Sequence, residues 1–173
     1  MNVPPSTPEP WLRGTLTDVA AVPRASLHAL ELAAEDLNKW CAQLTVAELN
    51  AKPHGLPSVA FQLRHIARSI DRLLTYAECG QLTGEQIAAL KTELDPGATR
   101  CDLFAEIESA FERSAARIRA IDANRLNEPR KVGKKGLPTT VGGLLVHVAD
   151  HTQRHVGQAI TTAKIVKAGV SAR

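Results

Sequence analysis

Apolar residues recur three and four positions apart through four long stretches of the chain. This spacing places the apolar side chains on one face of an amphipathic helix. It predicts four helices, over about 24–42, 58–78, 99–120 and 141–167. Proline and glycine interrupt the pattern between the first two helices, and Asp95-Pro96-Gly97 forms a turn signal before the third. The pattern therefore predicts an all-α protein.

Shorter signals fill the connections between these helices. Thr45-Val-Ala-Glu48 and Thr83-Gly-Glu-Gln86 have the form of capping boxes, and each predicts the start of a short helix. The second short helix is expected to reach about Leu94. The polar, basic stretch 127–138 has no helical period, so we expect a loop or an irregular hairpin that turns at Gly133.

Four amphipathic helices joined by polar loops predict a four-helix bundle. The connection between the second and third long helices spans about 20 residues and carries its own short helix. It is long enough to cross the bundle from end to end, which would leave those two helices parallel; the sequence permits this topology without requiring it. We expect a Pro-rich N-terminal arm over 1–22, one bundle over 23–168 and a frayed tail over 169–173.

The composition argues against several classes of protein. The chain has 173 residues, which fits one domain, and a net charge of +3 with only 3% aromatic residues. So few rings argue against a base-stacking platform, and so small a charge does not indicate nucleic acid. No apolar run approaches the roughly 20 residues that span a bilayer, and the polar N-terminus does not resemble a secretory signal. We therefore expect a cytoplasmic protein without nucleic-acid or membrane partners.

The three cysteines, Cys41, Cys79 and Cys101, are an odd number and are widely spaced, so they predict neither a disulfide framework nor a zinc knuckle. Cys41 is expected in the core. The basic residues of the 127–138 stretch predict a solvated turn; the alternative is attraction of an anionic cofactor, a phosphate or a partner. These residues are Arg130, Lys131, Lys134 and Lys135.

Three histidines four residues apart stand on the last helix: His147, His151 and His155. Side chains four apart lie one above the other, about 5–6 Å apart at Cβ, so two of them can converge on one metal ion. The first and third are separated by about 12 Å along the axis, so all three cannot bind the same ion. A further ligand must come from another helix.

The position of each ring around the helix axis selects the pair. With the centre of the apolar stripe between Leu144 and Leu145, His155 lies about 45° away, His151 about 85° and His147 about 125°. His151 and His155 are therefore predicted as ligands on the shoulder of the core. His147 is expected to make a supporting or surface contact, with replacement of a ligand as the alternative.

The predicted third ligand is His65, on the second long helix. Its flank also carries Gln62 and Ser69, which are polar enough to line a pocket. His28 is expected opposite the apolar stripe of its helix and His54 in a loop, so both are expected to be surface histidines. Neither a general base nor any other catalytic residue can be assigned from the sequence. The HExxH, Walker and serine-elbow motifs are missing, which excludes those enzyme classes.

Two segments resemble the DinB-like (DinB/YfiT) superfamily. One is Pro57-Ser-Val-Ala-Phe-Gln-Leu-Arg-His65-Ile, and the other is the helical ending His151-xxx-His155-x-Gly157-Gln158. The resemblance extends from the first helix to about residue 166. It implies a bundle of up-down-down-up topology and a divalent ion held by His65, His151 and His155. Val156 departs from the pattern, because many relatives carry arginine before Gly-Gln, and any contact of that arginine with substrate would be missing here.

The resemblance also implies a function. Members are often homodimers, and relatives include isomerases and transferases that use the low-molecular-weight thiols mycothiol or bacillithiol. We expect a divalent ion, zinc or nickel first and manganese or iron second, and an enzyme that acts on a small molecule as a thiol-dependent transferase or isomerase or as a hydrolase. Three neutral imidazoles leave a position on the ion open for water or a thiolate. The alternative is a non-catalytic stress-response bundle that binds a metal or a partner.

Overall fold

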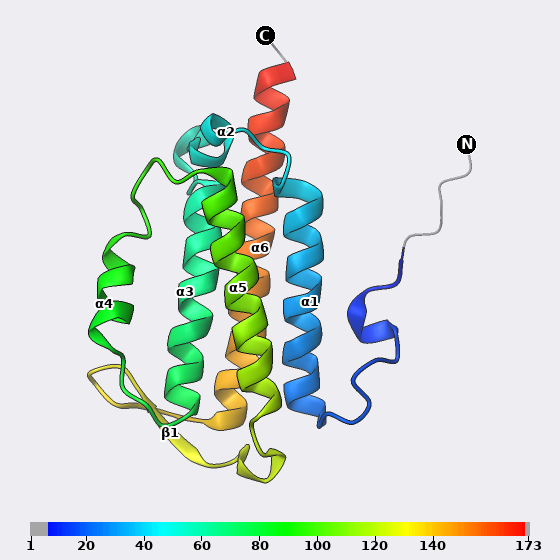
Figure 1. Ribbon diagram of the computed structural model, residues 1–173, viewed down its shortest axis with the longest axis vertical. Helices are drawn as coiled ribbons and strands as arrows, with labels where there is room; N and C mark the ends of the chain where they lie inside the picture. The colour runs from blue at the N-terminus through cyan, green and yellow to red at the C-terminus, as the bar shows by residue number, and fades with distance from the viewer. Residues whose placement is uncertain (1–6, 172–173) are drawn as a thin grey trace.

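Four long helices lie side by side and form the body of the protein (Figure 1). The structure is a computed structural model that describes residues 7–171, with side chains to 169. The long helices are α1 (Ala21–Cys41), α3 (Val59–Ala77), α5 (Arg100–Arg119) and α6 (Val141–Ser171). A two-stranded hairpin is the only sheet in the part of the chain described, so the mostly helical class is confirmed. No helix within residues 7–171 has an apolar run long enough to traverse a membrane.

The direction of each long helix follows from its connection. In Figure 1, α1 and α6 run upward, whereas α3 and α5 both run downward. The short helix α2 (Val46–Asn50) closes the upper end between α1 and α3. A long crossover that contains α4 (Gly84–Lys91) leads from the lower end of α3 back to the upper end of α5. Helix α3 packs between α5 and α6, and α1 packs against α6 and α5.

Local sequence signals set the starts of three helices. Thr45 and Glu48 form a complete capping box on α2, and Thr83 and Gln86 form another on α4. Thr99, which immediately precedes α5, forms a third capping box with Asp102. In each box a threonine oxygen accepts a backbone N–H while the partner side chain accepts the N–H of the threonine, so two orphan donors are satisfied. These predicted starts are confirmed.

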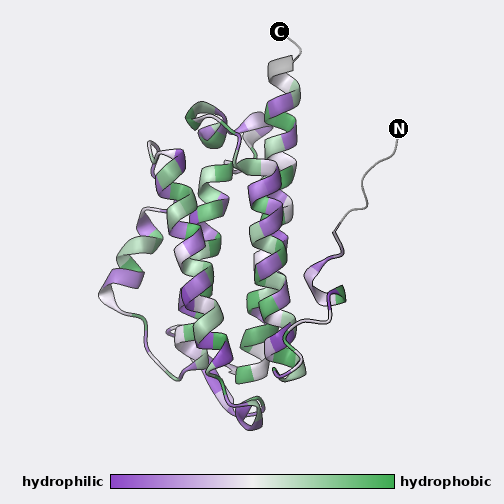
Figure 2. Cartoon of the chain, turned by 45° about the vertical axis from the view of Figure 1, so that its right-hand side comes forward, coloured by the Kyte–Doolittle hydropathy of each residue, from purple (hydrophilic) through white to green (hydrophobic). Residues whose placement is uncertain are grey.

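The core is built from the predicted apolar faces. Aliphatic side chains from all four long helices are buried, and hydrophobic and hydrophilic residues alternate along each helix in Figure 2. The largest fully buried side chains are Leu27, Leu37, Leu44, Leu49, Leu63, Ile66, Ile70, Leu74, Leu103, Ile107, Ile118 and Leu145. The core contains few aromatic rings, as the composition indicated.

The crossover between α3 and α5 attaches to the bundle mainly through polar groups. Helix α4 contains no buried residue, and its Ile87 and Leu90 are 46% and 40% exposed. Gln86 donates to Asp71 Oδ2 over 2.6 Å and to Thr75 Oγ1 over 2.9 Å, which ties the start of α4 to α3. The later part of the crossover is tied to α3 by arginines, which are described with the site.

The chain before α1 packs along that helix and buries a histidine. Arg13 makes two hydrogen bonds to Glu35, of 2.6 and 2.8 Å, and Leu16 packs against the core. Thr15 Oγ1 lies 3.2 Å from His28 Nε2, and His28 is only 7% exposed. The prediction of a surface histidine was therefore wrong, because the arm covers the outer side of α1. Residues 1–6 of the predicted arm lie outside the described residues.

The polar stretch before α6 forms a hairpin of β1 (Pro129–Val132) and β2 (Leu137–Thr140), with left-handed glycines at the turn. Arg130 was expected in a solvated turn, and this was wrong for that residue. Its Nε donates to the Ala77 carbonyl over 2.7 Å at the end of α3, and the side chain is buried. Thr140 Oγ1 then accepts from the Gly143 N–H at the start of α6. That helix continues to Ser171, beyond the predicted end at 167, and residues 172–173 lie outside the described residues.

Candidate metal centre

Three histidine rings from two helices meet on one side of the bundle. One nitrogen of each of His65, His151 and His155 lies within 4.8 Å of the others. The ring centroids are 5.1 Å apart for His65 and His151, and 4.4 Å apart for each of the other two pairs. The structure therefore brings together the three residues that the sequence singled out, although they are up to 90 residues apart in the chain.

The fourth histidine of the region lies outside this group. His147 is one turn earlier on α6, with its ring 5.3 Å from that of His151, and its side chain is 46% exposed. Its Nδ1 is 2.8 Å from Asp150 Oδ1, and Arg154 pairs with the other oxygen of the same carboxylate. His147 thus takes part in a surface cluster of charged groups, as its angle from the apolar stripe predicted.

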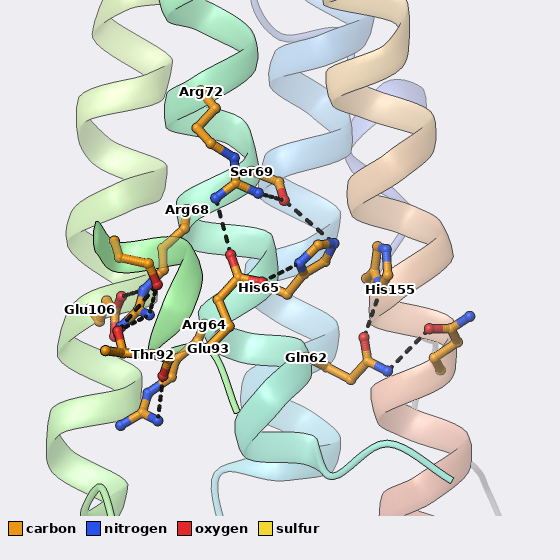
Figure 3. A network of polar contacts seen from close by, with 12 residues as sticks. Gln62, Arg64, His65, Arg68, Ser69, Arg72, Thr92, Glu93, Glu106 and His155 are labelled. Atoms are coloured by element: carbon orange, nitrogen blue, oxygen red, sulfur yellow. Dashed lines mark hydrogen bonds and ion pairs between the residues drawn. The ribbon is translucent and has the colours of Figure 1, made fainter. Parts of the chain in front are cut away.

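A carboxylate fixes the protonation of His65. Its Nδ1 lies 2.8 Å from Glu93 Oε2, and an ionised carboxylate can only accept (Figure 3). His65 Nδ1 therefore carries a proton, and in the neutral ring the lone pair is on Nε2. Burial raises the pKa of Glu93, but the hydrogen bonds from His65 and Arg72 and the charges of both residues outweigh this effect. The pKa of Glu93 consequently lies below its usual value and the group stays ionised.

The side-chain amide of Gln62 fixes the position of the proton on the His155 ring in the same way. Gln62 Oε1 lies 2.7 Å from His155 Nδ1, and the Gln62 amide nitrogen donates to Gln158 Oε1 over 3.1 Å. Because the Gln62 nitrogen is committed to Gln158, its oxygen faces the ring and accepts from Nδ1. The lone pair of His155 is again on Nε2. Burial, followed by the charge of His65, lowers the pKa of His155, which favours the neutral ring.

His151 completes the cluster and has an unsatisfied nitrogen. Its Nδ1 is buried and has no hydrogen-bond partner. Burial, followed by the charges of His155, His65 and His147, lowers its pKa to about 4. A buried nitrogen without a partner is costly, unless a ligand satisfies it. A metal ion bound to the cluster requires neutral rings, and these surroundings keep His151 neutral at physiological pH.

This pKa predicts acid sensitivity in the metal-free protein. Histidine in the unfolded chain binds a proton near pH 6.5, whereas the pKa of folded His151 is about 4. Between those values the unfolded state holds more protons, so the free energy of unfolding should fall as the pH is lowered. Urea unfolding at several pH values should show this slope, and His151→Gln should reduce it. An unchanged slope in that variant would contradict the assignment.

Sequence reasoning found the three histidines and missed the group that orients His65. Glu93 follows α4 in the crossover, where no periodic signal marks it, and it is nonetheless buried. Gln62 and Ser69 were placed correctly on the flank of His65, because all three residues lie on one helix. The contact of Gln62 with His155 could not be predicted in this way, because it depends on the packing of α3 against α6. Ser69 Oγ lies 3.4 Å from His65 Nε2.

The cluster could bind a metal ion. Three imidazoles are a common donor set for zinc in sites that keep an open position. Among the residues described, no fourth histidine, cysteine or acidic side chain joins the group. A carboxylate or amide acceptor on the far nitrogen of a ligating histidine is the usual support for such a ring, and two of the three rings have one. The residues therefore fit a divalent ion.

The fold and the site together define a helical protein with a three-histidine cluster between two long helices. Comparison with family models matches residues 29–159 to the DinB superfamily. The chain therefore belongs to the DinB superfamily, a metal-associated group. A comparison with curated proteins gives no match.

Among solved structures, the chain is similar to a conserved protein from Enterococcus faecalis. The two share 24% sequence identity with a TM-score of 0.67, over 87% of this chain and 99% of the other. At this identity the similarity shows the fold alone.

Proposed function

We propose that this protein is a divalent-metal-dependent enzyme whose ion is held by His65, His151 and His155. The observation that carries the proposal is the hydrogen bonding of the three rings. Two rings donate from Nδ1 to fixed acceptors, and the third has an unsatisfied buried nitrogen. We also propose the up-down-down-up topology of the family, which the helix directions in Figure 1 support.

The surroundings of the cluster support catalysis over a purely structural role. A pocket of about 210 Å³ is lined by residues that include Phe61, Glu93, Ser58 and Lys52. It borders the cluster, because Phe61 stacks on the His65 ring at 5.3 Å and Glu93 bonds the same ring. None of the three histidines lines it, and it is smaller than the roughly 300–1,000 Å³ of most ligand sites, so it would admit a small molecule or part of one.

When bound, zinc or nickel would supply a Lewis acid that activates water, polarises a carbonyl or takes up a thiolate. The residues of the chain bring one nitrogen of each ring within 4.8 Å of the others, burial favours neutral His151 and His155, and Phe61 stacks on one face of His65. We propose a low-molecular-weight thiol as the second component, as in thiol-dependent transferases and isomerases. The three imidazoles suit this role because they add no negative charge that would repel a thiolate.

Metal titration of protein purified without a histidine tag tests the proposal. Zinc or nickel should bind at one equivalent, measured by calorimetry and ion analysis. A ligand at 100 times its dissociation constant stabilises a protein by about 2.7 kcal/mol, which corresponds to a rise in melting temperature of about 5–10 °C for a domain of this size. Failure of all the divalent ions to bind or stabilise the protein would disprove the site.

Activity separates an enzyme from a metal-binding bundle. The metal-loaded protein should consume an electrophile in the presence of a low-molecular-weight thiol, and the metal-free protein should not. Metal binding with no turnover across a panel of thiols and electrophiles would favour the non-catalytic alternative.

A further inference from the structure

A row of arginines on α3 connects the crossover to the metal centre. Arg64, Arg68 and Arg72 are four residues apart, so they lie along one face of the helix (Figure 3). Arg64 donates to the carbonyls of Thr92 and Asp95, and Arg68 donates to the Ala89 carbonyl over 2.7 Å. We call these three residues the arginine row.

The third arginine of the row, Arg72, binds the side chain of Glu93 in the crossover. Arg72 Nη1 donates to Glu93 Oε1 over 3.0 Å, while His65 donates to Oε2 of the same carboxylate over 2.8 Å. Arg72 Nη2 also donates to Ser69 Oγ over 3.0 Å, and Ser69 contacts His65. Glu93, Arg72, Ser69 and His65 thus form a closed ring of hydrogen bonds.

Glu93 is unusual in its segment. Its neighbours in the crossover are exposed, whereas Glu93 is only 7% exposed. A buried carboxylate is costly unless it is paired and hydrogen-bonded, and both of its oxygens here face charged or ionisable donors. The crossover has little apolar contact to hold it, so the arginine row and Gln86 determine where Glu93 lies.

We propose that the crossover is a working part of the metal centre: Glu93 is a positioning residue that holds His65 in its ligating tautomer, and the arginine row holds Glu93. This inference rests on the proposed metal site. A carboxylate behind a ligating histidine fixes the orientation of the ring and raises its basicity, and removal of such a partner typically weakens metal binding by about 10–100-fold. Linkage then requires that metal binding stabilise the docked crossover in return.

The test compares Glu93→Gln with Glu112→Gln, which removes an exposed carboxylate of α5. In the metal-free proteins, long-range proton–nitrogen NMR reports the tautomer of His65. Glu93→Gln should lower the population protonated at Nδ1, because the single amide oxygen would accept from Arg72 and the amide nitrogen would then face His65; Glu112→Gln should not. Zinc competition assays should show affinity about 10–100-fold weaker for Glu93→Gln alone. In the wild type, zinc should slow hydrogen exchange of amides 89–95.

Arg68→Gln supplies a second variant, because Arg68 touches the crossover and not the histidine. It should speed amide exchange over 89–95 and weaken zinc binding in the same direction as Glu93→Gln. Normal zinc binding by the wild type, together with an unchanged tautomer and affinity in Glu93→Gln, would overturn this inference and leave the metal site intact. A wild type that binds none of the divalent ions would instead overturn the proposed function, and this inference with it.

Discussion

Replacing His151 with alanine is expected to weaken zinc binding by roughly 10²- to 10³-fold. Structural zinc sites with four protein ligands release about 10–16 kcal/mol, or about 2.5–4 kcal/mol for each ligand, and each 1.4 kcal/mol is a factor of ten. His151 is one of the three rings of the cluster, and its centroid lies within 5.1 Å of both others. Competition with a chromophoric chelator measures the affinity directly.

The matched control is His147→Ala, which removes a histidine one turn away on the same helix. Its side chain is 46% exposed and pairs with Asp150 at the surface, so its loss should change zinc affinity by no more than about fivefold. Thermal unfolding of both metal-free variants checks that the helices remain intact. Equal affinity losses in the two variants would show that the ion is not held where we propose.

Replacing Ile66 with alanine is expected to lower the free energy of unfolding by about 2–5 kcal/mol. Ile66 is completely buried, directly after His65 on α3, and helices α5 and α6 pack on either side of that helix. Truncation removes apolar contact and leaves a cavity that the surrounding aliphatic side chains fill only in part. Urea unfolding of the metal-free protein measures the loss.

Ile87→Ala is the matched control for this substitution. Ile87 lies on α4 and is 46% exposed, so the same change should cost less than about 1 kcal/mol. A large loss at Ile87 would show that α4 is covered in solution by a surface the structure does not contain. A small loss at Ile66 would contradict the packing of α3 at the centre of the protein.

The long helices and the short helices α2 and α4 could be predicted from sequence because their signals are local. The capping pairs at Thr45, Thr83 and Thr99 need only residues three positions apart, and the buried stripes follow the period of the helix. The pair His151 and His155 could be predicted for the same reason. The angles around the axis of that helix also predicted that both residues are more buried than His147.

The contacts that the sequence did not reveal join distant segments. His28 is buried by an arm whose path depends on the pairing of Arg13 with Glu35. Arg130 is buried because the hairpin folds back onto the end of α3. Glu93 reaches His65 only after the crossover has docked. No periodic pattern encodes these positions, because each depends on where an irregular segment settles.

The separation of the ligands along the chain has a consequence for biosynthesis. His65 leaves the ribosome well before His151 and His155, and the intervening residues include the whole crossover and α5. A nascent chain that ends before α6 contains only His65 of the three histidines, so it has no partner rings to share an ion. Metal binding at the proposed site therefore requires translation of the final helix.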